Sequence, residues 1–198
     1  MDLMAPCPIC GTDYRNLPPT EHVVDGKVIT YSPTFAGALD YSPYVFLQLM
    51  HREWRRPMDE EDTFSGLPEG SRPARRLLLV LTFWTYFESL MGWFYESATR
   101  NLPGRVSSDL LRRYNSIGGR LDRLHRVLFD STYGQDLDLL GFASVRRHLE
   151  LIQTQRNAFM HGNPQSITDS LVEETVVLIP KFHEAWIESF NRRCAKRN

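Results

Sequence analysis

The chain has little cysteine, no excess of charge of either sign and no leader-like beginning. Its 198 residues include only three cysteines, an odd number that argues against a disulfide framework and for a reducing cytoplasm. The 23 basic and 24 acidic side chains give a formal net charge of −1, so contact with nucleic acid would need a local basic patch. Residues 1–10 lack a basic stretch followed by a long apolar run, which predicts no signal peptide and a cytoplasmic location.

Only one stretch is apolar enough to suggest a membrane span. Residues 77–95 form a run of 19 residues whose only charge is Glu88. A membrane helix needs about 20 apolar residues, but a charge near its middle is costly, and threonines and a serine dilute this run. We therefore expect a central helix that is buried on most sides of a bundle, and no membrane partner.

Residues 1–40 differ in composition from the rest of the chain. They are rich in Pro, Gly, Thr and Val, and the pair Asp25-Gly26 between β-branched runs predicts a hairpin. Beyond Ser42-Pro43, which suit the start of a helix, apolar residues recur with helical spacing. The sequence predicts an all-α fold, with an antiparallel helical bundle over residues 41–198 and a small zinc-ribbon-like β-hairpin appendage over residues 1–40.

The limits of the expected helices follow from caps and breakers. The helices should span about residues 43–56, 73–101, 108–128, 142–161 and 169–192. Gly118-Gly119 interrupts the third helix and Pro180 should kink the last. Residues 132–141 are expected to form a loop.

The segment "CPICG" at residues 7–11 looks like half of a zinc site. The spacing of Cys7 and Cys10 lets both thiolates reach one metal ion, and the glycine permits a tight turn. Structural zinc needs four ligands, and no second C-x-x-C occurs. His22, His183 and Cys194 are candidates, or two half-sites could join across a dimer. The alternative is a degenerate ribbon that has lost its metal.

The segment "RNAFMHG" at residues 156–162 carries charged and polar groups where a helix should end. On a straight helix Arg156 falls within the apolar stripe, whereas Asn157 and His161 share another face. Arg156 and His161 therefore converge only under one of two conditions. Either the last turn loosens before Gly162 and the arginine curls round, or two copies of the helix meet across a dimer.

These residue types suit chemistry on a phosphate. His161 would lie in the last helical turn, where exposed carbonyl groups favour a positive charge, and histidine is the usual general acid or base. The guanidinium of Arg156 could hold a phosphate and stabilise negative charge that develops on it. Glu88 could support Arg156 or the nucleophile in catalysis, or it could simply form a structural salt bridge with Arg156.

The arginine, the following asparagine, and the histidine and glycine at the helix end resemble the R-x4-H motif of HEPN domains. The resemblance covers residues 41–198 and includes the long helix after the motif. It implies metal-independent cleavage of RNA by a homodimer, in which the 2′-hydroxyl attacks the adjacent phosphate. His161 would act as acid or base, Arg156 would bind the phosphate and Asn157 would orient the groups.

The resemblance also bears on partners. HEPN proteins include toxins, phage-defence effectors and RNA-processing factors, so RNA, a second copy and an antitoxin or defence-complex partner are expected. Asn163 stands where members paired with nucleotidyltransferase antitoxins often have tyrosine, which argues against that branch. Some HEPN domains have lost the chemistry and serve as modules that bind nucleic acid or nucleotide or act as scaffolds, and this is the alternative interpretation.

Two further features could serve RNA binding or dimerisation. Residues 100–126 contain seven arginines and only two aspartates, which could attract RNA phosphates or form a solvated outer face. We expect His125, inside this stretch, to lie on the surface. The seven aromatic residues between positions 83 and 95 could be buried by a dimer or by neighbouring helices.

Overall fold

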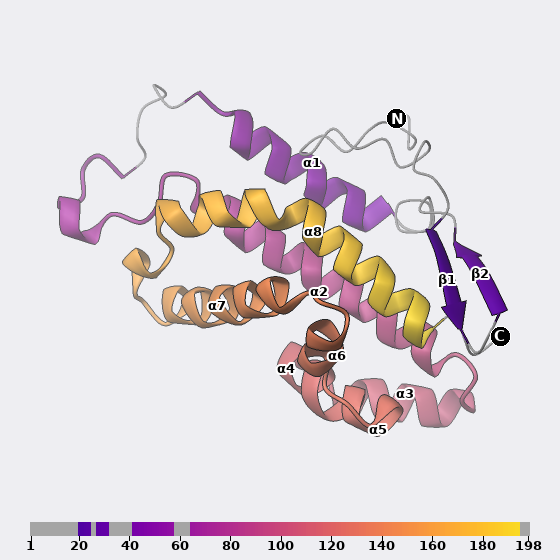
Figure 1. Ribbon diagram of the computed structural model, residues 1–198. Coiled ribbons are helices and arrows are strands. Elements are labelled where there is room, and N and C mark those ends of the chain that lie inside the picture. The colour runs from indigo at the N-terminus through magenta and orange to yellow at the C-terminus, as the bar shows by residue number, and fades with distance from the viewer. Residues whose placement is uncertain (1–19, 25–26, 32–40, 58–63, 195–198) are drawn as a thin grey trace.

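The computed structural model describes residues 20–24, 27–31, 41–57 and 64–194 of the chain. Its larger helices are α1 (Tyr41–Arg55), α2 (Leu77–Thr99), α3 (Gly104–Arg113), α6 (Tyr133–Leu139), α7 (Ala143–Met160) and α8 (Asp169–Arg193) (Figure 1). Shorter pieces are η2 (Glu69–Ser71), α4 (Ile117–Gly119), η3 (Arg120–Leu124, a π-helix), α5 (His125–Phe129) and η4 (Pro164–Ser166). The prediction of an all-α fold is confirmed for residues 41–57 and 64–194.

Helix α2 is the centre of the molecule and packs against α1, α7 and α8. Its buried side chains include most of its aromatic residues, and these meet aromatic side chains of α8. Phe83 and Phe87 each pack edge-on against Phe182, with ring centroids 5.2 and 5.8 Å apart, and Trp93 stacks on Trp186. The neighbouring helices therefore bury most of the aromatic side chains of α2 within one chain, and Trp93 is half-buried.

The length and composition of α2 alone would permit it to cross a membrane. In the structure, 56% of its most apolar window is buried inside the molecule. A core helix of a bundle passes the same test, so the hydropathy of α2 is explained by its central position.

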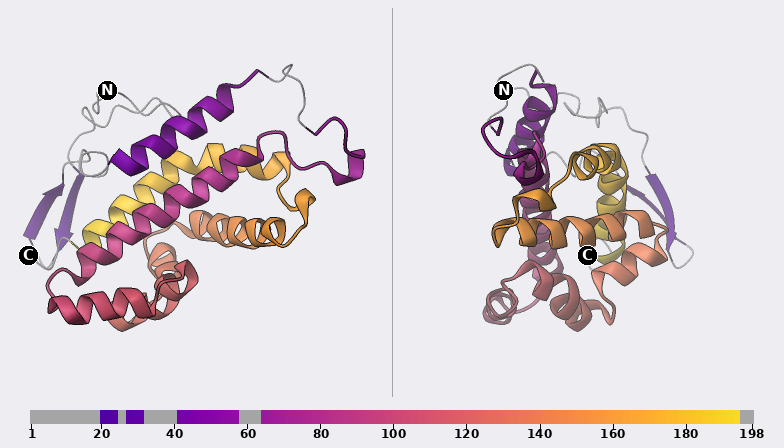
Figure 2. Two further views of the ribbon diagram at one scale, coloured as in Figure 1. Left: turned by 180° about the vertical axis from the view of Figure 1, so that it is seen from behind. Right: turned by 90° about the vertical axis from the view of Figure 1, so that its left-hand side faces the viewer.

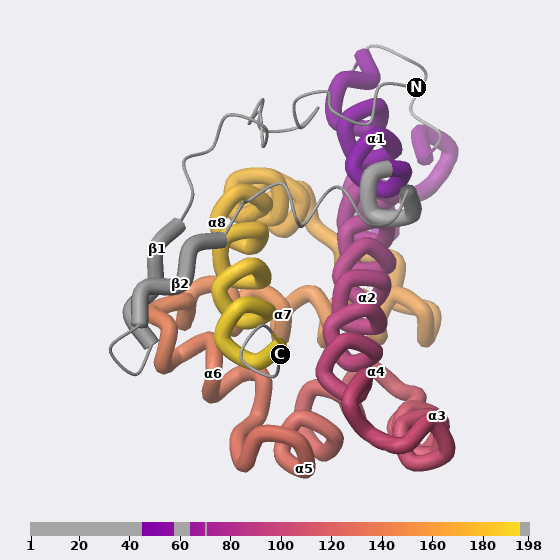
Figure 3. The backbone as a smooth tube through the Cα atoms, turned by 90° about the vertical axis from the view of Figure 1, so that its right-hand side faces the viewer, coloured from indigo at the N-terminus to yellow at the C-terminus, as the bar shows by residue number. Residues whose placement is uncertain are grey.

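The helices run in both directions across the bundle. Figures 1 and 2 show that α1 runs antiparallel to α2 and that α7 runs antiparallel to α8. Helices α2 and α8 run in the same direction, because the chain passes through α3–α6 and returns along α7 before it enters α8. Figure 3 shows α3 and α5 at the end of the molecule where α2 finishes.

The segment between α2 and α7 differs from expectation. The predicted helix over residues 108–128 is broken after Arg113, and the chain resumes at Ser116, whose hydroxyl accepts a hydrogen bond from the Gly119 N–H at 3.2 Å. The predicted loop over residues 132–141 is wrong, because it contains α6. Thr132 and Gln135 form a capping box at its start, with hydrogen bonds of 2.8 and 3.1 Å.

Helix α8 begins as predicted, with Thr168 as its N-cap, since the threonine hydroxyl accepts from the Leu171 N–H at 3.2 Å. Pro180 lies inside this helix, which changes direction along its length in Figure 1. A proline inside a helix removes one backbone hydrogen bond and crowds the preceding turn, which accounts for the bend.

Strands β1 (Thr20–Val24) and β2 (Lys27–Tyr31) pair antiparallel, from Thr20 opposite Tyr31 to Val24 opposite Lys27. Cys7 and Cys10 lie outside the described residues. The zinc-ribbon-like character of this segment, and its separation from the bundle at residue 40, therefore stay predictions.

Candidate functional site

The C-terminal end of α7 is built by a glycine in the left-handed conformation. Gly162 has φ +93°, its N–H donates to Phe159 O at 3.0 Å, and the Asn163 N–H donates to Ala158 O at 3.0 Å. These two bonds make a Schellman motif, which satisfies carbonyl groups that the helix end would otherwise leave open. The predicted helix end at residue 161 is confirmed, and the motif leaves His161 exposed as the last residue before the chain turns.

Arg156 and Asn157 are brought together one turn before this end. Arg156 is half-buried and Asn157 is exposed, and Arg156 Nη1 donates to Asn157 Oδ1 at 3.3 Å. Although a straight helix directs the two side chains to different faces, the long arginine curls round toward Asn157. The guanidinium reaches Asn157 and not His161, so the convergence that the first of the two arrangements required is not made.

His161 is not joined to these two side chains. Its backbone N–H bonds to Asn157 O at 3.0 Å and Ala158 O at 3.2 Å, and no side-chain hydrogen bond links it to Arg156 within the described residues. The arrangement in one chain is therefore a guanidinium with an amide, and an imidazole exposed further along. The guanidinium can bind a phosphate and the imidazole can exchange a proton with a ligand that reaches both.

Glu88 is placed differently from its predicted role. It is half-buried on α2, and its Oε1 accepts a hydrogen bond from Trp84 Nε1 at 2.7 Å. In the described part of the chain Glu88 forms no ion pair with Arg156, so the expected salt bridge is not made. The indole one turn earlier on the same helix holds this carboxylate instead.

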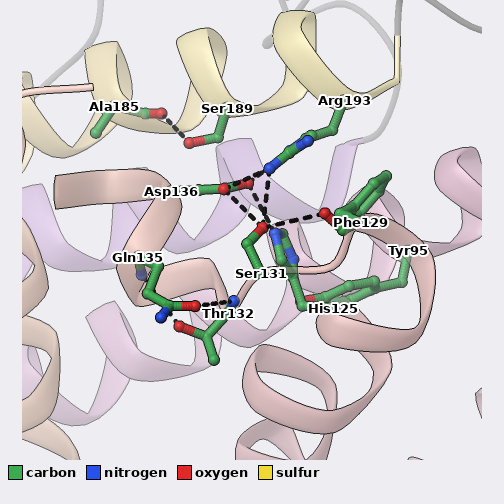
Figure 4. A network of polar contacts seen from close by, with 10 residues as sticks. All are labelled: Tyr95, His125, Phe129, Ser131, Thr132, Gln135, Asp136, Ala185, Ser189 and Arg193. Atoms are coloured by element: carbon green, nitrogen blue, oxygen red, sulfur yellow. Dashed lines mark hydrogen bonds and ion pairs between the residues drawn. The ribbon is translucent and has the colours of Figure 1, made fainter. Parts of the chain in front are cut away.

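The most extensive polar cluster is one that the sequence did not indicate. Figure 4 shows the Asp136 network, defined here as Tyr95, His125, Ser131, Asp136 and Arg193. Asp136 Oδ2 lies 2.9 Å from His125 Nε2 and 2.6 Å from Arg193 Nε, and the Ser131 hydroxyl donates to Oδ1 at 2.8 Å. Arg193 also donates through Nη2 to Asp136 Oδ1, which makes the contact bidentate.

The electrostatics of this cluster determine the charge of His125 and which of its ring nitrogens carries the proton. Burial alone would raise the pKa of Asp136, but hydrogen bonds from His125, Arg193 and Ser131 outweigh it and lower that pKa. Burial lowers the pKa of His125 more than Asp136 raises it, so the imidazole is neutral. Because ionised Asp136 only accepts, His125 donates through Nε2 and receives the Tyr95 hydroxyl at Nδ1, 3.0 Å away.

The Asp136 network is closed to substrates. His125 and Tyr95 are 0% exposed and Asp136 is 1% exposed, so no ligand can touch the imidazole. The prediction that His125 lies on the surface is wrong, because the chain between α3 and α6 turns this residue inward against Phe94 and Phe129. The cluster joins α2, α5, α6 and the end of α8, and its role is structural.

Two other histidines are also buried. His183 Nε2 lies 2.7 Å from the Tyr86 hydroxyl, and burial lowers the pKa of His183 to about 4. His148 Nε2 lies 3.0 Å from Thr175 Oγ1, and that hydroxyl donates to Leu171 O, so the histidine donates to it. These two side chains lie within the bundle and do not approach the end of α7.

The predicted zinc ligands are not brought together in the described residues. Over residues 41–57 and 64–194, no group of three or more His, Cys, Asp or Glu side chains could hold a metal ion. His183 Nε2 is engaged by Tyr86, and the half-buried Cys194 has its Sγ 3.6 Å from Phe94 O. Cys7, Cys10 and the side chain of His22 are not described, so a zinc site in the N-terminal segment stays a prediction.

No known protein family, curated protein or solved structure matches this chain. The HEPN resemblance therefore rests on the motif and on its position in a helical bundle.

Proposed function

We propose that this protein is a metal-independent endoribonuclease of the HEPN type, acting as a homodimer and serving as a defence or toxin effector. The observation that carries the proposal is the end of α7. Within the described residues Arg156 there forms no ion pair, its side chain hydrogen-bonds to the Asn157 amide, and an exposed His161 follows. A half-buried guanidinium without a carboxylate partner is suited to an anionic ligand.

The chemistry assigns one task to each group. The RNA 2′-hydroxyl loses its proton to a base and attacks the adjacent phosphorus, and the bond to the 5′-oxygen breaks. The products are a cyclic 2′,3′-phosphate and a 5′-hydroxyl, which takes up a proton from an acid. His161 of one copy acts as base or acid, Arg156 neutralises the phosphate and Asn157 holds the guanidinium in position.

Two observations favour a composite site. The reaction needs one group that accepts a proton and another that donates one, whereas each chain supplies a single exposed histidine at the end of α7. Arg156 and His161 also make no hydrogen bond to each other within one chain. A second copy would supply the missing histidine, and Glu88, held by Trp84, takes no part in this scheme.

The test is cleavage of a single-stranded RNA in the presence of EDTA. Wild-type protein should leave cyclic phosphate ends, and His161→Ala should lower the rate by about 10²–10⁴-fold, the usual contribution of a general acid or base. His51→Ala, which removes a histidine from α1, is the matched control and should cleave normally. Cleavage that persists in His161→Ala would refute the assignment.

The same separation of Arg156 and His161 supports an alternative, a HEPN-like module without catalysis that binds nucleic acid or nucleotide or acts as a scaffold. Under this alternative the wild-type protein binds RNA and leaves it intact in every metal condition. Light scattering adds a second criterion, since a monomer at micromolar concentration would contradict the composite site.

A further inference from the structure

The outward side of α3 carries a concentration of arginine. Arg105, Asp109, Arg112 and Arg113 recur at helical spacing on one side of this helix, and we refer to them as the α3 arginine face. The side chains of Arg112 and Arg113 are 84% and 66% exposed. A shallow hollow beside them is lined by residues 104–106, 108–110 and 112–113.

Packing does not explain these arginines. Helix α3 has no fully buried residue, and its hydrophobic side chains that pack against the core, Leu110 and Leu111, lie on its other side. Asp109 accepts from Arg112 at 2.9 Å and from Arg113 at 3.1 Å, but solvent screens such exposed pairs and they stabilise the fold little. Arg112 and Arg113 therefore share one carboxylate, and Arg105 forms no ion pair within the described residues.

The positive charge extends beyond α3. Arg123 and Arg126 are exposed on η3 and α5, where Asp122 is the only carboxylate, and it pairs with Arg126 at 3.0 Å. Figures 1 and 3 show α3 and α5 at the same end of the molecule. A chain with a net charge of −1 therefore concentrates positive charge on one end.

We propose that the α3 arginine face binds the phosphate backbone of single-stranded RNA and acts as an anchoring surface separate from the cleavage site. The identification of RNA rests on the proposed function. The surface itself suits a ligand with several phosphate groups at regular spacing. A planar guanidinium group is always charged and can donate two hydrogen bonds to the oxygens of one phosphate. A strand would displace the weak pairs with Asp109 and release counterions, which makes binding depend on salt.

The position of the surface defines its role. Figures 1 and 2 show α3 on a different side of the molecule from the C-terminal end of α7, so a nucleotide bound at Arg156 would not lie on α3. The α3 arginine face therefore holds a part of the strand away from the scissile bond. It raises the affinity for long RNA without changing the chemical step.

Binding is measured by fluorescence anisotropy in EDTA with a 2′-O-methyl RNA, which has no free 2′-hydroxyl to react. The strand has about 20 nucleotides, more than the roughly 4–16 that one binding fold covers. A triple Gln variant of Arg105, Arg112 and Arg113 should bind about 10-fold more weakly. Its slope of log K against log salt should be smaller in magnitude by about 2, since each phosphate contact on a single strand contributes about 0.7.

The matched control is a triple Gln variant of Arg52, Arg55 and Arg147, which are exposed on α1 and α7 and carry the same total charge. It should bind as wild type does. Equal loss in both variants, or no loss in the α3 variant, would overturn the proposal. So would binding to phosphatidylserine vesicles without binding to RNA. Because all six substituted arginines are exposed, both variants should show the wild-type circular dichroism, which is recorded first.

Cleavage data separate this inference from the proposed function. If wild-type protein cleaves RNA and the α3 variant binds normally, the anchoring surface is refuted and the ribonuclease stands. If no cleavage occurs but the α3 variant alone loses binding, the surface stands and the catalytic assignment fails. If both hold, the α3 variant should raise KM for long RNA and leave kcat unchanged.

Discussion

Arg193, in the last turn of α8, makes a bidentate contact with the carboxylate of Asp136 on α6, 57 positions earlier in the chain. Asp136 is 1% exposed and the Arg193 side chain is 20% exposed. The contact fastens the end of the last helix to the segment between α2 and α7. The guanidinium also lies over the Phe129 ring, 5.1 Å from its centre.

We predict that Asp136→Asn destabilises the protein by about 3 kcal/mol, because Arg193 and His125 lose the charge that pairs with them in a buried site. Urea unfolding followed by circular dichroism measures this. Asp138→Asn removes a carboxylate from the same helix that pairs with Arg146 in an exposed position, and it should cost no more than about 1 kcal/mol. Equal effects of the two substitutions would contradict a structural role for the Asp136 network.

Stability should fall as the pH drops from about 6.5 to 4, and His183 should be one cause. Its pKa is about 4 in the fold and 6.5 when the chain unfolds. Between these values the unfolded state binds a proton that the folded state does not, so the stabilisation is complete above pH 6.5 and declines below it. This group alone accounts for about 3 kcal/mol.

Urea unfolding at a series of pH values tests the role of His183. The His183→Gln variant should lose less stability than wild type across this range. Tyr86→Phe keeps the imidazole buried and should keep the pH dependence, since burial, not the hydroxyl, lowers the pKa. An unchanged profile in His183→Gln would refute this explanation.

Arg156→Lys should lower RNA cleavage by about 10²-fold although the charge is kept, because an ammonium group cannot make the planar paired contact with phosphate. The rate of cleavage in EDTA at saturating RNA is the measurement. Arg147→Lys changes an exposed arginine on the same helix and should cleave as wild type does. Full activity of Arg156→Lys would mean that the guanidinium does not bind the reacting phosphate.

Gly162→Ala should cost about 1–2 kcal/mol, because its φ of +93° is unfavourable for any residue with a Cβ atom. The strained helix end should also move His161 and reduce cleavage. Gly104→Ala is the control, since its backbone is not in that region and a methyl group there meets no atom within 4 Å. This change should stabilise the protein by about 0.5 kcal/mol. If both substitutions behave alike, the geometry of Gly162 is not what holds the helix end.

Local sequence signals predicted the features that depend on near neighbours. The start of α8 at Asp169, the end of α7 before Gly162 and the bend at Pro180 each depend on backbone groups within one turn. The same kind of signal, Thr132 with Gln135, marks the start of α6 in the sequence. Among the candidate site residues, the positions of Arg156, Asn157 and His161 at the end of α7 could be predicted from helical spacing alone.

The tertiary structure decided which side chains meet. Helical spacing assigned Arg156 and Asn157 to different faces, but the length and flexibility of the arginine side chain bring its guanidinium to Asn157. Glu88 bonds to Trp84 rather than to Arg156, because the nearer partner on its own helix satisfies it.

By itself, the sequence determined where α7 ends, where α8 begins and which residues stand at the end of α7, since caps and periodicity act over a few residues. It could not locate the Asp136 network, whose members are brought together from α2, α5, α6 and α8 only when the bundle packs. His125 shows why. In sequence it lies in an arginine-rich stretch, next to Arg126, whereas its neighbours in space are Tyr95, Asp136 and the aromatic core, and burial against these decides its charge.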